Sequence, residues 1–367
     1  MPELPVAPTV LAERVKALAL ALGFDRAGIA ALGEPTPAAE SLREWIARGR
    51  HGEMAWLAHR VDERIDPRRR FAWARTAIVV GIVYDTPGDA RDSPCATPEA
   101  TGRVARYAGG EDYHDVLLAP LRALGDALEA LVGRPVQSRA YVDTGPLLER
   151  ALAAQAGLGW IGRNTCLIDP TLGSYLFLGV LLTDLELPAD APEPDHCGSC
   201  RACLDACPTD AFPTPYVLDA TRCLSYTTIE LRAEIPEPLR AGQGDWVFGC
   251  DICQQVCPWN LRTRREIPAD RAGLRARIAP RDEWVRPTLA WLLSLDEDAW
   301  RGATRRTALR RTKRRGLLRN ALIAAGNAGD LGLRSLLDTH AASDDPVIAE
   351  AARWALARLG TAACADS

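Results

Sequence analysis

The sequence lacks any apolar run long enough to cross a membrane. The apolar residues 17–22 follow Glu13, Arg14 and Lys16, which makes them one face of an amphipathic helix. A spanning helix requires about 20 consecutive apolar residues, and no other stretch approaches that length. We therefore expect a cytoplasmic protein without a membrane span or a secretory signal.

Lysine is nearly missing: Lys16 and Lys313 are the only two, so 42 of the 44 basic residues are arginine. The formal net charge of −4 argues against a general binder of polyanions. Acids are absent from residues 301–319, where nine basic residues give a local charge of +9 and leave −13 for the rest. These nine are Arg301, Arg305, Arg306, Arg310, Arg311, Lys313, Arg314, Arg315 and Arg319.

Such a concentrated basic segment predicts a surface for phosphate. Among its residues, Arg311, Lys313, Arg314 and Arg315 are the candidates for contacts to RNA. The alternative is a solvated helix face in an arginine-rich protein. We favour RNA because no acid in the run balances the charge.

The periodicity of apolar residues indicates an α+β protein in three parts. Helices are predicted at 9–23, 37–48, 116–131 and 146–156, and strands at 77–84, 136–142 and 174–182. A linker rich in Pro and Asp follows at 185–196, and the pattern is helical from residue 288. We therefore expect an α/β domain at 1–185, a cysteine-rich domain at 186–287 and a helical domain at 288–367. Breaks near 326–330 and 343–346 favour HEAT-type repeats in the last domain, with a plain helical bundle as the alternative.

Eight of the eleven cysteines lie between Cys197 and Cys257 in two blocks. The first has the spacing CxxCxxCxxxCP of bacterial ferredoxins, in which the fourth cysteine binds the other cluster. The second block repeats CxxCxxxCP and is preceded by an isolated cysteine. This pattern predicts two [4Fe–4S] clusters, one held by Cys197, Cys200, Cys203 and Cys257 and the other by Cys207, Cys223, Cys250 and Cys253.

Zinc is the alternative ligand, since paired CxxC motifs also form zinc ribbons, but it does not account for the repeated CxxxCP spacing. The remaining cysteines, Cys95, Cys166 and Cys364, are expected to be ordinary small residues. Two neighbouring clusters transfer single electrons, so the site that consumes them is expected within residues 1–185.

Seven further segments give the chain a specific resemblance. They are GEMAWL (52–57), GGEDYH (109–114), YVDTGPLLER (141–150), AGLGWIGRNT (156–165), CLSYTTIELR (223–232), FGCDICQQVCPWN (248–260) and RRGLLRNALIAAGN (314–327). Together with the cysteine blocks, they make the chain resemble the epoxyqueuosine reductases along nearly its whole length. The resemblance implies reduction of epoxyqueuosine to queuosine at the wobble position of tRNA, by cobalamin bound between the first two domains and supplied with electrons by the clusters. The resemblance further implies that the helical domain completes the tRNA surface.

The resemblance also implies roles for individual residues. Asp143 is the expected proton donor, although an aspartate there also suits the cap of the helix that begins near Pro146. The family positions near the corrinoid are Asp143, Arg163, Asn164, Ser225 and Asp251, and Arg232 is a further tRNA contact. Ser225 and Asp251 adjoin cluster cysteines, so the alternative is that they cap the cluster loops. The sequence has no DxHxxG motif, so we expect no protein histidine on cobalt.

Other functions fit less of the sequence. The residues GLGWIG (157–162) have GxGxxG spacing but do not clearly follow a strand, which argues against a dinucleotide site. A reductive dehalogenase shares the cofactor plan but has no need of a basic helical tail, and a simple electron carrier would bind no corrinoid. We expect a monomer that receives electrons from a donor of the flavodoxin or ferredoxin type.

Overall fold

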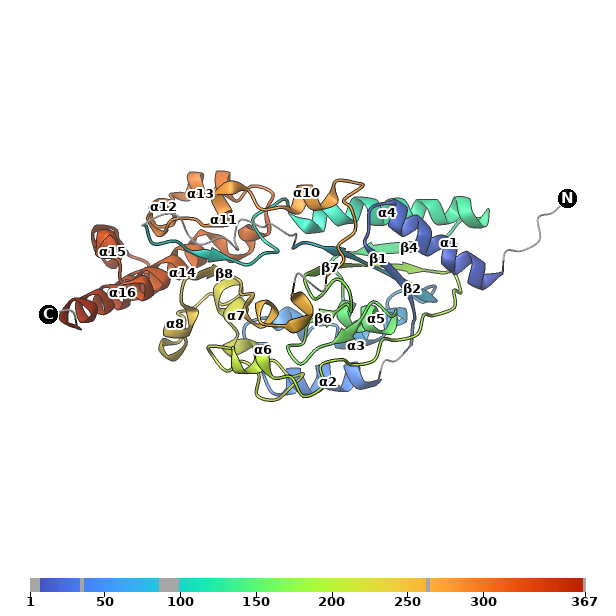
Figure 1. The fold of residues 1–367 in the computed structure, drawn as a ribbon, viewed down its shortest axis with the longest axis horizontal. Coiled ribbons are helices and arrows are strands. Elements are labelled where there is room, and N and C mark those ends of the chain that lie inside the picture. The colour runs from blue at the N-terminus through green and yellow to red at the C-terminus, as the bar shows by residue number, and fades with distance from the viewer. Residues whose placement is uncertain (1–6, 34–35, 86–98, 262–264, 366–367) are drawn as a thin grey trace.

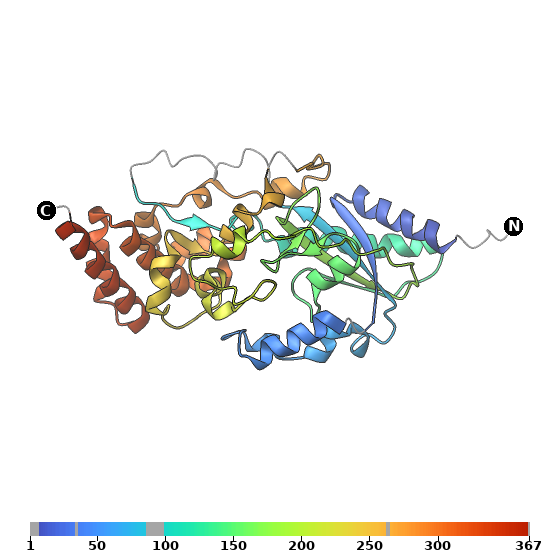
Figure 2. The same cartoon turned by 60° about the horizontal axis from the view of Figure 1, so that its bottom comes forward.

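The computed structural model describes residues 7–33, 36–85, 99–261 and 265–365. The molecule is elongated, with a sheet near the N-terminus and stacked helices at the opposite, C-terminal end (Figures 1 and 2). Within the described residues, no helix is both long and apolar enough to cross a membrane. Cys95 and the Cys364 side chain lie outside the described part of the chain.

A four-stranded antiparallel sheet organises the N-terminal half, in the order β1-β2-β7-β4. Its strands are β1 (Arg26–Ala31), β2 (Thr76–Val83), β7 (Leu176–Thr183) and β4 (Ser138–Tyr141). All eight residues of β2 are buried, because helices cover both faces of the sheet. Alternate residues serve the two faces: Ile78, Val80 and Ile82 pack into one core, and Ala77 and Val79 into the other.

Five helices belong to this half. They are α1 (Pro8–Ala21), α2 (Thr36–Ala47), α3 (Val61–Ile65), α4 (Tyr113–Val132) and α5 (Glu149–Gln155). Helices α1 and α4 lie on one face of the sheet and α5 on the other (Figure 1). A short hairpin, β5 (Trp160–Ile161) with β6 (Leu167–Ile168), follows α5.

The cysteine-rich part contains only short elements among its described residues. These are α6 (Ala202–Asp205), α7 (Leu224–Ile229), α8 (Glu237–Gln243), β8 (Trp246–Phe248) and α9 (Ile252–Gln255). Strand β8 pairs in parallel with β3 (Arg103–Val104). Residues of the N-terminal half thereby join the hydrophobic core that the C-terminal helices form. Val104 and Ala108 pack there with buried side chains of the C-terminal helices.

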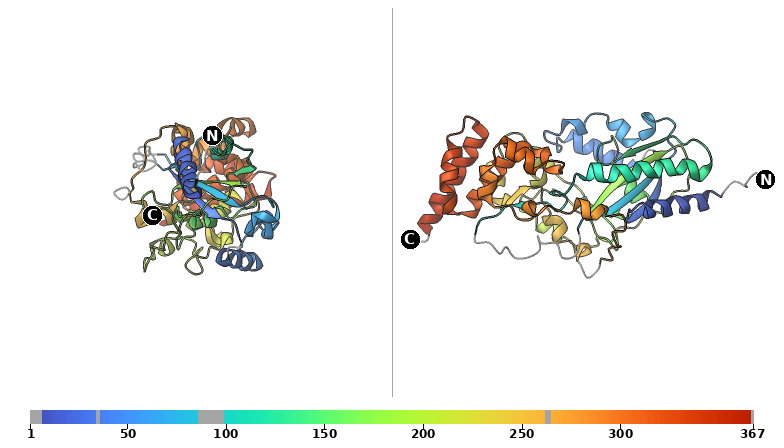
Figure 3. Two further views of the ribbon diagram at one scale, coloured as in Figure 1. Left: turned by 90° about the vertical axis from the view of Figure 1, so that its right-hand side faces the viewer. Right: turned by 90° about the horizontal axis from the view of Figure 1, so that it is seen from above.

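The C-terminal part is helical, as the sequence predicts. It comprises α10 (Leu274–Ile278), α11 (Asp282–Val285), α12 (Leu289–Ser294), α13 (Glu297–Ala303), α14 (Lys313–Ala328), α15 (Arg334–Ala341) and α16 (Pro346–Ala365). The last three are separated near the predicted breaks and pack together at one end of the molecule (Figure 3). The mixed helix-and-sheet class and all the helices and strands predicted for residues 1–185 are confirmed. Strand β1 was not predicted.

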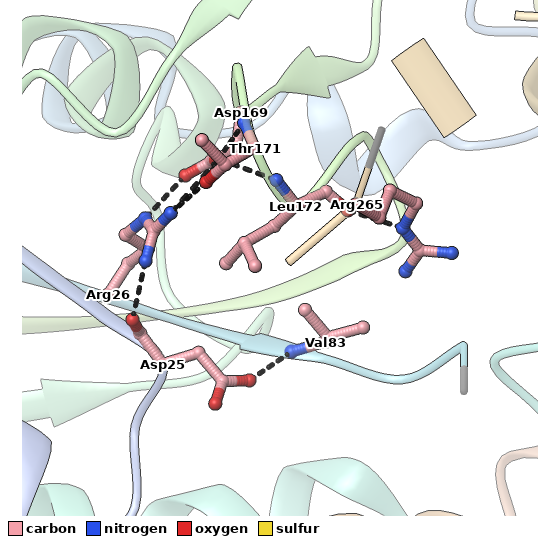
Figure 4. A network of polar contacts seen from close by, with 7 residues as sticks. All are labelled: Asp25, Arg26, Val83, Asp169, Thr171, Leu172 and Arg265. Carbon is pink, nitrogen blue, oxygen red and sulfur yellow. Dashed lines mark hydrogen bonds and ion pairs between the residues drawn. The ribbon is translucent and has the colours of Figure 1, made fainter. Parts of the chain in front are cut away.

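Buried ion pairs attach the segment that follows the cysteine blocks to the N-terminal sheet. The Asp25 carboxylate accepts a hydrogen bond of 2.8 Å from the Val83 N–H (Figure 4). It also accepts one of 3.0 Å from Arg275. The next residue, Arg26, pairs with buried Asp169 at 2.7 Å. Buried charges are stable only when paired in this way.

The same network reaches the second cysteine block. Buried Asp85 pairs with Arg106 at 2.6 Å and with Arg265, whose Nε also donates to the Leu172 carbonyl at 2.8 Å (Figure 4). The Arg106 N–H in turn donates to the buried Asp251 carboxylate at 2.8 Å. The loop that carries Cys250 and Cys253 is thus held to the end of β2.

Candidate functional site

Asp143 lies in the loop that follows β4 and has a left-handed backbone, with φ of +52°. Its side chain is 67% exposed, so it faces open space rather than the core. The Tyr113 hydroxyl donates to Asp143 Oδ2 at 2.7 Å, and His114 Nε2 lies 3.8 Å from the same oxygen. The Asp143 N–H donates to Glu149 Oε1 at 2.8 Å. A strained residue with this many ordered polar neighbours is typical of a functional position.

The neighbours of Asp143 keep it ionised. Desolvation opposes ionisation, but the contacts with His114 and Tyr113 outweigh it and lower the pKa of Asp143. Desolvation lowers the pKa of His114, but the hydrogen bond of 2.6 Å that its Nδ1 donates to Asp112 and the charge of Asp143 raise it to about 9. His114 is therefore a cation between two carboxylates at neutral pH.

Glu149 behaves in the opposite way to Asp143. Desolvation, with the nearby negative charge of Asp143, raises the pKa of Glu149 to about 8. Near neutral pH the group therefore holds one proton on His114 and one on Glu149, with Asp143 between them. A proton donor at neutral pH is expected to have a raised pKa, whereas the pKa of Asp143 is lowered, so its proton has to come from a neighbour.

The first predicted set of cysteines lines one cavity. Cys197, Cys200, Cys203 and Cys257 surround a space of about 220 Å³. Trp160 Nε1 donates to Cys197 Sγ at 3.5 Å, and Cys200 is exposed at the surface. Four thiols around one cavity match the donor set of a [4Fe–4S] cluster.

Arg163 and Asn164 also line this cavity, so Arg163 lies with the first cysteine set rather than with Asp143. The Arg163 Nε–H is buried and has no hydrogen-bond partner among the described residues. A positively charged donor at this cavity suits the negative charge of a thiolate-bound cluster.

The thiols of the second predicted set influence one another electrostatically. Burial, with smaller contributions from neighbouring thiolates, raises the pKa of Cys223 to about 11 and raises that of Cys250 as well. Cys207 contributes to both shifts, and Cys223 and Cys250 contribute to that of Cys253. The four therefore lie together, and iron binding would have to displace their protons.

The described residues contain no three His, Cys, Asp or Glu side chains that converge as ligands of a single ion would. The case for clusters rests instead on the cavity, the grouping of thiols and the spacing of the motif.

Tyr107 connects the Asp143 loop with the second cysteine set. The centre of the Tyr107 ring lies 6.2 Å from that of Tyr113, the hydrogen-bond donor to Asp143, and Tyr107 packs against the same small core as Cys250. Ser225 and Asn164 lie beside the same cysteines: the Ser225 N–H donates to Cys223, and the Asn164 amide donates to the Cys253 carbonyl at 3.4 Å. The Ser225 contact fits the alternative in which Ser225 and Asp251 cap the cluster loops, and Asn164 is bonded to the backbone of the second cysteine block.

The predicted tRNA contacts gather at the start of α14. The Arg232 guanidinium donates to the backbone carbonyls of Arg311 and Thr312 at 2.9 and 3.0 Å, and Arg315 donates to the Arg232 carbonyl at 2.7 Å. Arg314 donates to the Leu295 carbonyl. Lys313 is exposed and has a left-handed backbone.

Acids distant in sequence balance part of the basic run. Arg311 pairs with Glu230 at 2.9 Å, and Arg315 pairs with Asp345. Although residues 301–319 contain no acid, part of their positive charge is therefore neutralised in the folded protein. Arg305, Arg310 and Lys313 are exposed and form no ion pair with any described residue.

Sequence reasoning missed four residues near the site. Tyr113 and His114 lie in the segment GGEDYH, and these two adjacent polar ring side chains could have indicated a functional position. The sequence did not single out Glu149, because its proximity to Asp143 depends on the turn between β4 and α5. Cys166 was expected to be ordinary, yet its thiol contacts Cys253.

Two family models match the chain. The "4Fe-4S double cluster binding domain" covers residues 196–260, and "Epoxyqueuosine reductase QueG, DUF1730" covers residues 64–144. An epoxyqueuosine reductase of Gloeobacter violaceus is 45% identical over 342 residues, which are 91% of this chain and 100% of the relative.

Solved structures agree with this similarity. An epoxyqueuosine reductase crystallised with an epoxyqueuosine-modified tRNA stem loop superposes with a TM-score of 0.86 at 30% identity, over 96% of this chain and 91% of that chain. The Bacillus subtilis enzyme, whose catalytic aspartate loop is described as swung out of the active site, has a TM-score of 0.84 at 28% identity, over 95% and 90% of the two chains.

Proposed function

Since the chain belongs to the epoxyqueuosine reductase family, we propose that it reduces the epoxide of epoxyqueuosine in tRNA to the alkene of queuosine. Removing the epoxide oxygen as water consumes two electrons and two protons. The observation that carries the proposal is the hydrogen-bonded group around Asp143. Its member Tyr113 packs against Tyr107, which packs against the same core as Cys250.

The two predicted cysteine sets hold one [4Fe–4S] cluster each. Cys197, Cys200, Cys203 and Cys257 hold the first, supported by their common cavity. Cys207, Cys223, Cys250 and Cys253 hold the second, supported by their mutual electrostatic influence. Exposed Cys200 suits entry of electrons at the first cluster, from a donor of the flavodoxin or ferredoxin type.

The proposed position of cobalamin is between the Asp143 loop and the second cysteine set. Asp143, Ser225, Asp251, Asn164 and Arg163 are the proposed contacts, of which Arg163 lies farthest toward the first cysteine set. The buried Arg64 Nε–H, which has no hydrogen-bond partner among the described residues and lies near the Asp143 charge, is a donor that a polar ligand would satisfy. Bound cobalamin supplies the low-potential reaction centre.

The protein's own contribution is to hold and deliver protons. Asp143 is the group directed at the substrate, and we assign it the final transfer to the departing oxygen. Because the pKa of Asp143 is lowered and that of Tyr113 is raised, the cationic His114 at 3.8 Å is the nearest acid that can supply its proton. Glu149 holds the second proton in the same group. The catalytic aspartate loop described for the Bacillus subtilis relative supports this role.

The three-part layout, with 1–185 holding the catalytic loop, 186–287 the clusters and 288–367 HEAT-like helices for tRNA, is also part of the proposal. The basic residues at the start of α14 are the proposed contacts with tRNA phosphates. Arg232 acts by bracing Arg311 and Thr312. We expect the protein to act as a monomer.

Anaerobic reconstitution tests this function. Protein loaded with iron, sulfide and cobalamin is incubated with a chemical reductant and a stem loop that carries epoxyqueuosine, and the released nucleosides are analysed by mass spectrometry. Conversion to queuosine that requires both cobalamin and reductant is expected. A fully loaded protein that leaves epoxyqueuosine unchanged would overturn the proposal.

A further inference from the structure

Trp56 is an exposed tryptophan at the rim of the site. It lies in the short 3-10 turn η1 (Ala55–Leu57) and is 46% exposed. The guanidinium carbons of Arg64 and Arg311 lie 5.5 and 5.7 Å from the centre of its ring. A single exposed tryptophan is ordinary by itself, but a ring flanked by two cations is suited to an electron-rich planar partner.

The backbone that carries Trp56 is fixed by residues from distant parts of the chain. The Glu53 N–H donates to the Tyr226 hydroxyl at 2.8 Å, and the Arg232 N–H donates to the Glu53 carboxylate at 2.8 Å. Gly52 has φ of +57°, and a side chain there would collide with the Tyr226 ring. Trp56 is therefore held in place beside the start of α14.

The rim lies close to Asp143. Arg64 Nη1 donates to the carbonyl of Gly145, two residues after Asp143, at 3.4 Å. The Asp143 charge also acts on both arginines that flank Trp56. A planar group stacked on Trp56 would thus lie between the basic residues of α14 and the Asp143 loop.

We propose that Trp56, with Arg64 and Arg311 at its sides, is a stacking platform for an unpaired nucleobase of the tRNA anticodon loop. The proposal rests on the proposed function, since that function requires the modified base to leave its stack and approach Asp143. Proteins recognise single-stranded RNA largely by stacking splayed bases on aromatic rings and guanidinium planes. The two arginines hold the ring and attract the adjacent phosphates.

A purely structural role, in which Arg64 and Arg311 only fix the turn that carries Trp56, does not account for the exposure of the tryptophan ring. Trp354 on α16 is the useful comparison, because Arg240 and Arg358 flank it at 5.6 and 5.2 Å. It packs against Gly326 of α14 and is only partly exposed. A pair of arginines thus flanks the packed Trp354 on α16, and another pair flanks the exposed Trp56 near Asp143.

Binding of a fluorescent anticodon stem loop to reconstituted protein tests the platform. Loss of one base–aromatic stack costs about 1–3 kcal/mol, so Trp56→Ala should weaken binding by about 5- to 150-fold. Trp56→Phe should retain most of the affinity, and Trp354→Ala should bind as wild type does. Trp354→Phe replaces that control if its alanine variant melts below the assay temperature.

A loop carrying 2-aminopurine next to the modified base gives a second readout, since stacking quenches its fluorescence. Quenching by wild type that is lost in Trp56→Ala supports the platform. Unchanged binding and quenching in Trp56→Ala, or equal losses in Trp56→Ala and the Trp354 control, would overturn it while leaving the proposed function intact. Failure of wild type to bind the stem loop would instead overturn the proposed function, and the platform with it.

Discussion

The Tyr113 hydroxyl donates a hydrogen bond of 2.7 Å to Asp143 Oδ2, the oxygen that His114 approaches to 3.8 Å. Two adjacent residues at the start of α4 thus control the ionisation of a loop residue after β4. Because both contacts favour the carboxylate, Asp143 gives up a proton readily and needs a neighbour to restore it.

Tyr113→Phe should make protonation of Asp143 by His114 easier. Loss of one hydrogen bond to the carboxylate raises the pKa of Asp143 by roughly one unit. The pKa of Asp143 then lies closer to that of His114, so the rate of single turnover at neutral pH should rise by up to about 10-fold. Tyr141→Phe, at the end of β4, is the control and should leave the rate unchanged. A slower turnover for Tyr113→Phe would contradict the assignment.

His114→Gln should change how stability depends on pH. The pKa of His114 is raised from 6.5 to about 9 in the folded protein, so its charge stabilises the fold fully below pH 6.5. That stabilisation is lost as the pH rises to about 9. The melting temperature of wild type should therefore exceed that of His114→Gln most at low pH, and the gap should close across this window. A constant or widening gap would contradict the ion pairs with Asp112 and Asp143.

The cysteine assignment predicts which double substitutions are additive. Cys223→Ala and Cys257→Ala should each remove one cluster and about half of the bound iron, because they belong to different sets. Their combination should remove nearly all iron, whereas Cys223→Ala with Cys250→Ala should lose no more than either alone. Cys166→Ala should keep both clusters. Iron analysis and electron paramagnetic resonance would expose a different pairing.

The unpaired basic residues predict a change in salt dependence. Replacing Arg305, Arg310 and Lys313 with glutamine should flatten the slope of log affinity for the stem loop against log salt by up to about 2–3, since each phosphate contact contributes about 0.7–0.9. Arg14→Gln, on α1 at the far end of the molecule, is the control. A slope that is unchanged in the triple variant would remove the start of α14 from the tRNA surface.

Local patterns predicted much of the fold. Helix α4 and strand β2 follow directly from the spacing of their apolar residues. Strand β1 was missed because its sequence, RAGIAA, contains one β-branched residue among alanines and glycine, so its pairing with β2 decides its structure. In the cysteine blocks, motif spacing alone indicated the chemistry.

Contacts between distant residues could not be predicted. Glu230 and Asp345 lie outside the basic run yet pair with Arg311 and Arg315. The proton on Glu149 likewise depends on the turn that brings it to the Asp143 backbone. Both features arise from tertiary packing, which local sequence does not encode.

Asp143→Asn tests the central claim most directly. Asparagine tolerates the left-handed backbone at this position but has no proton to transfer, so the loop should keep its shape. In a single turnover with reduced protein, the variant should retain both clusters and bound cobalamin while forming queuosine about 100-fold or more slowly than wild type. Product formation at nearly the wild-type rate would contradict proton delivery by Asp143.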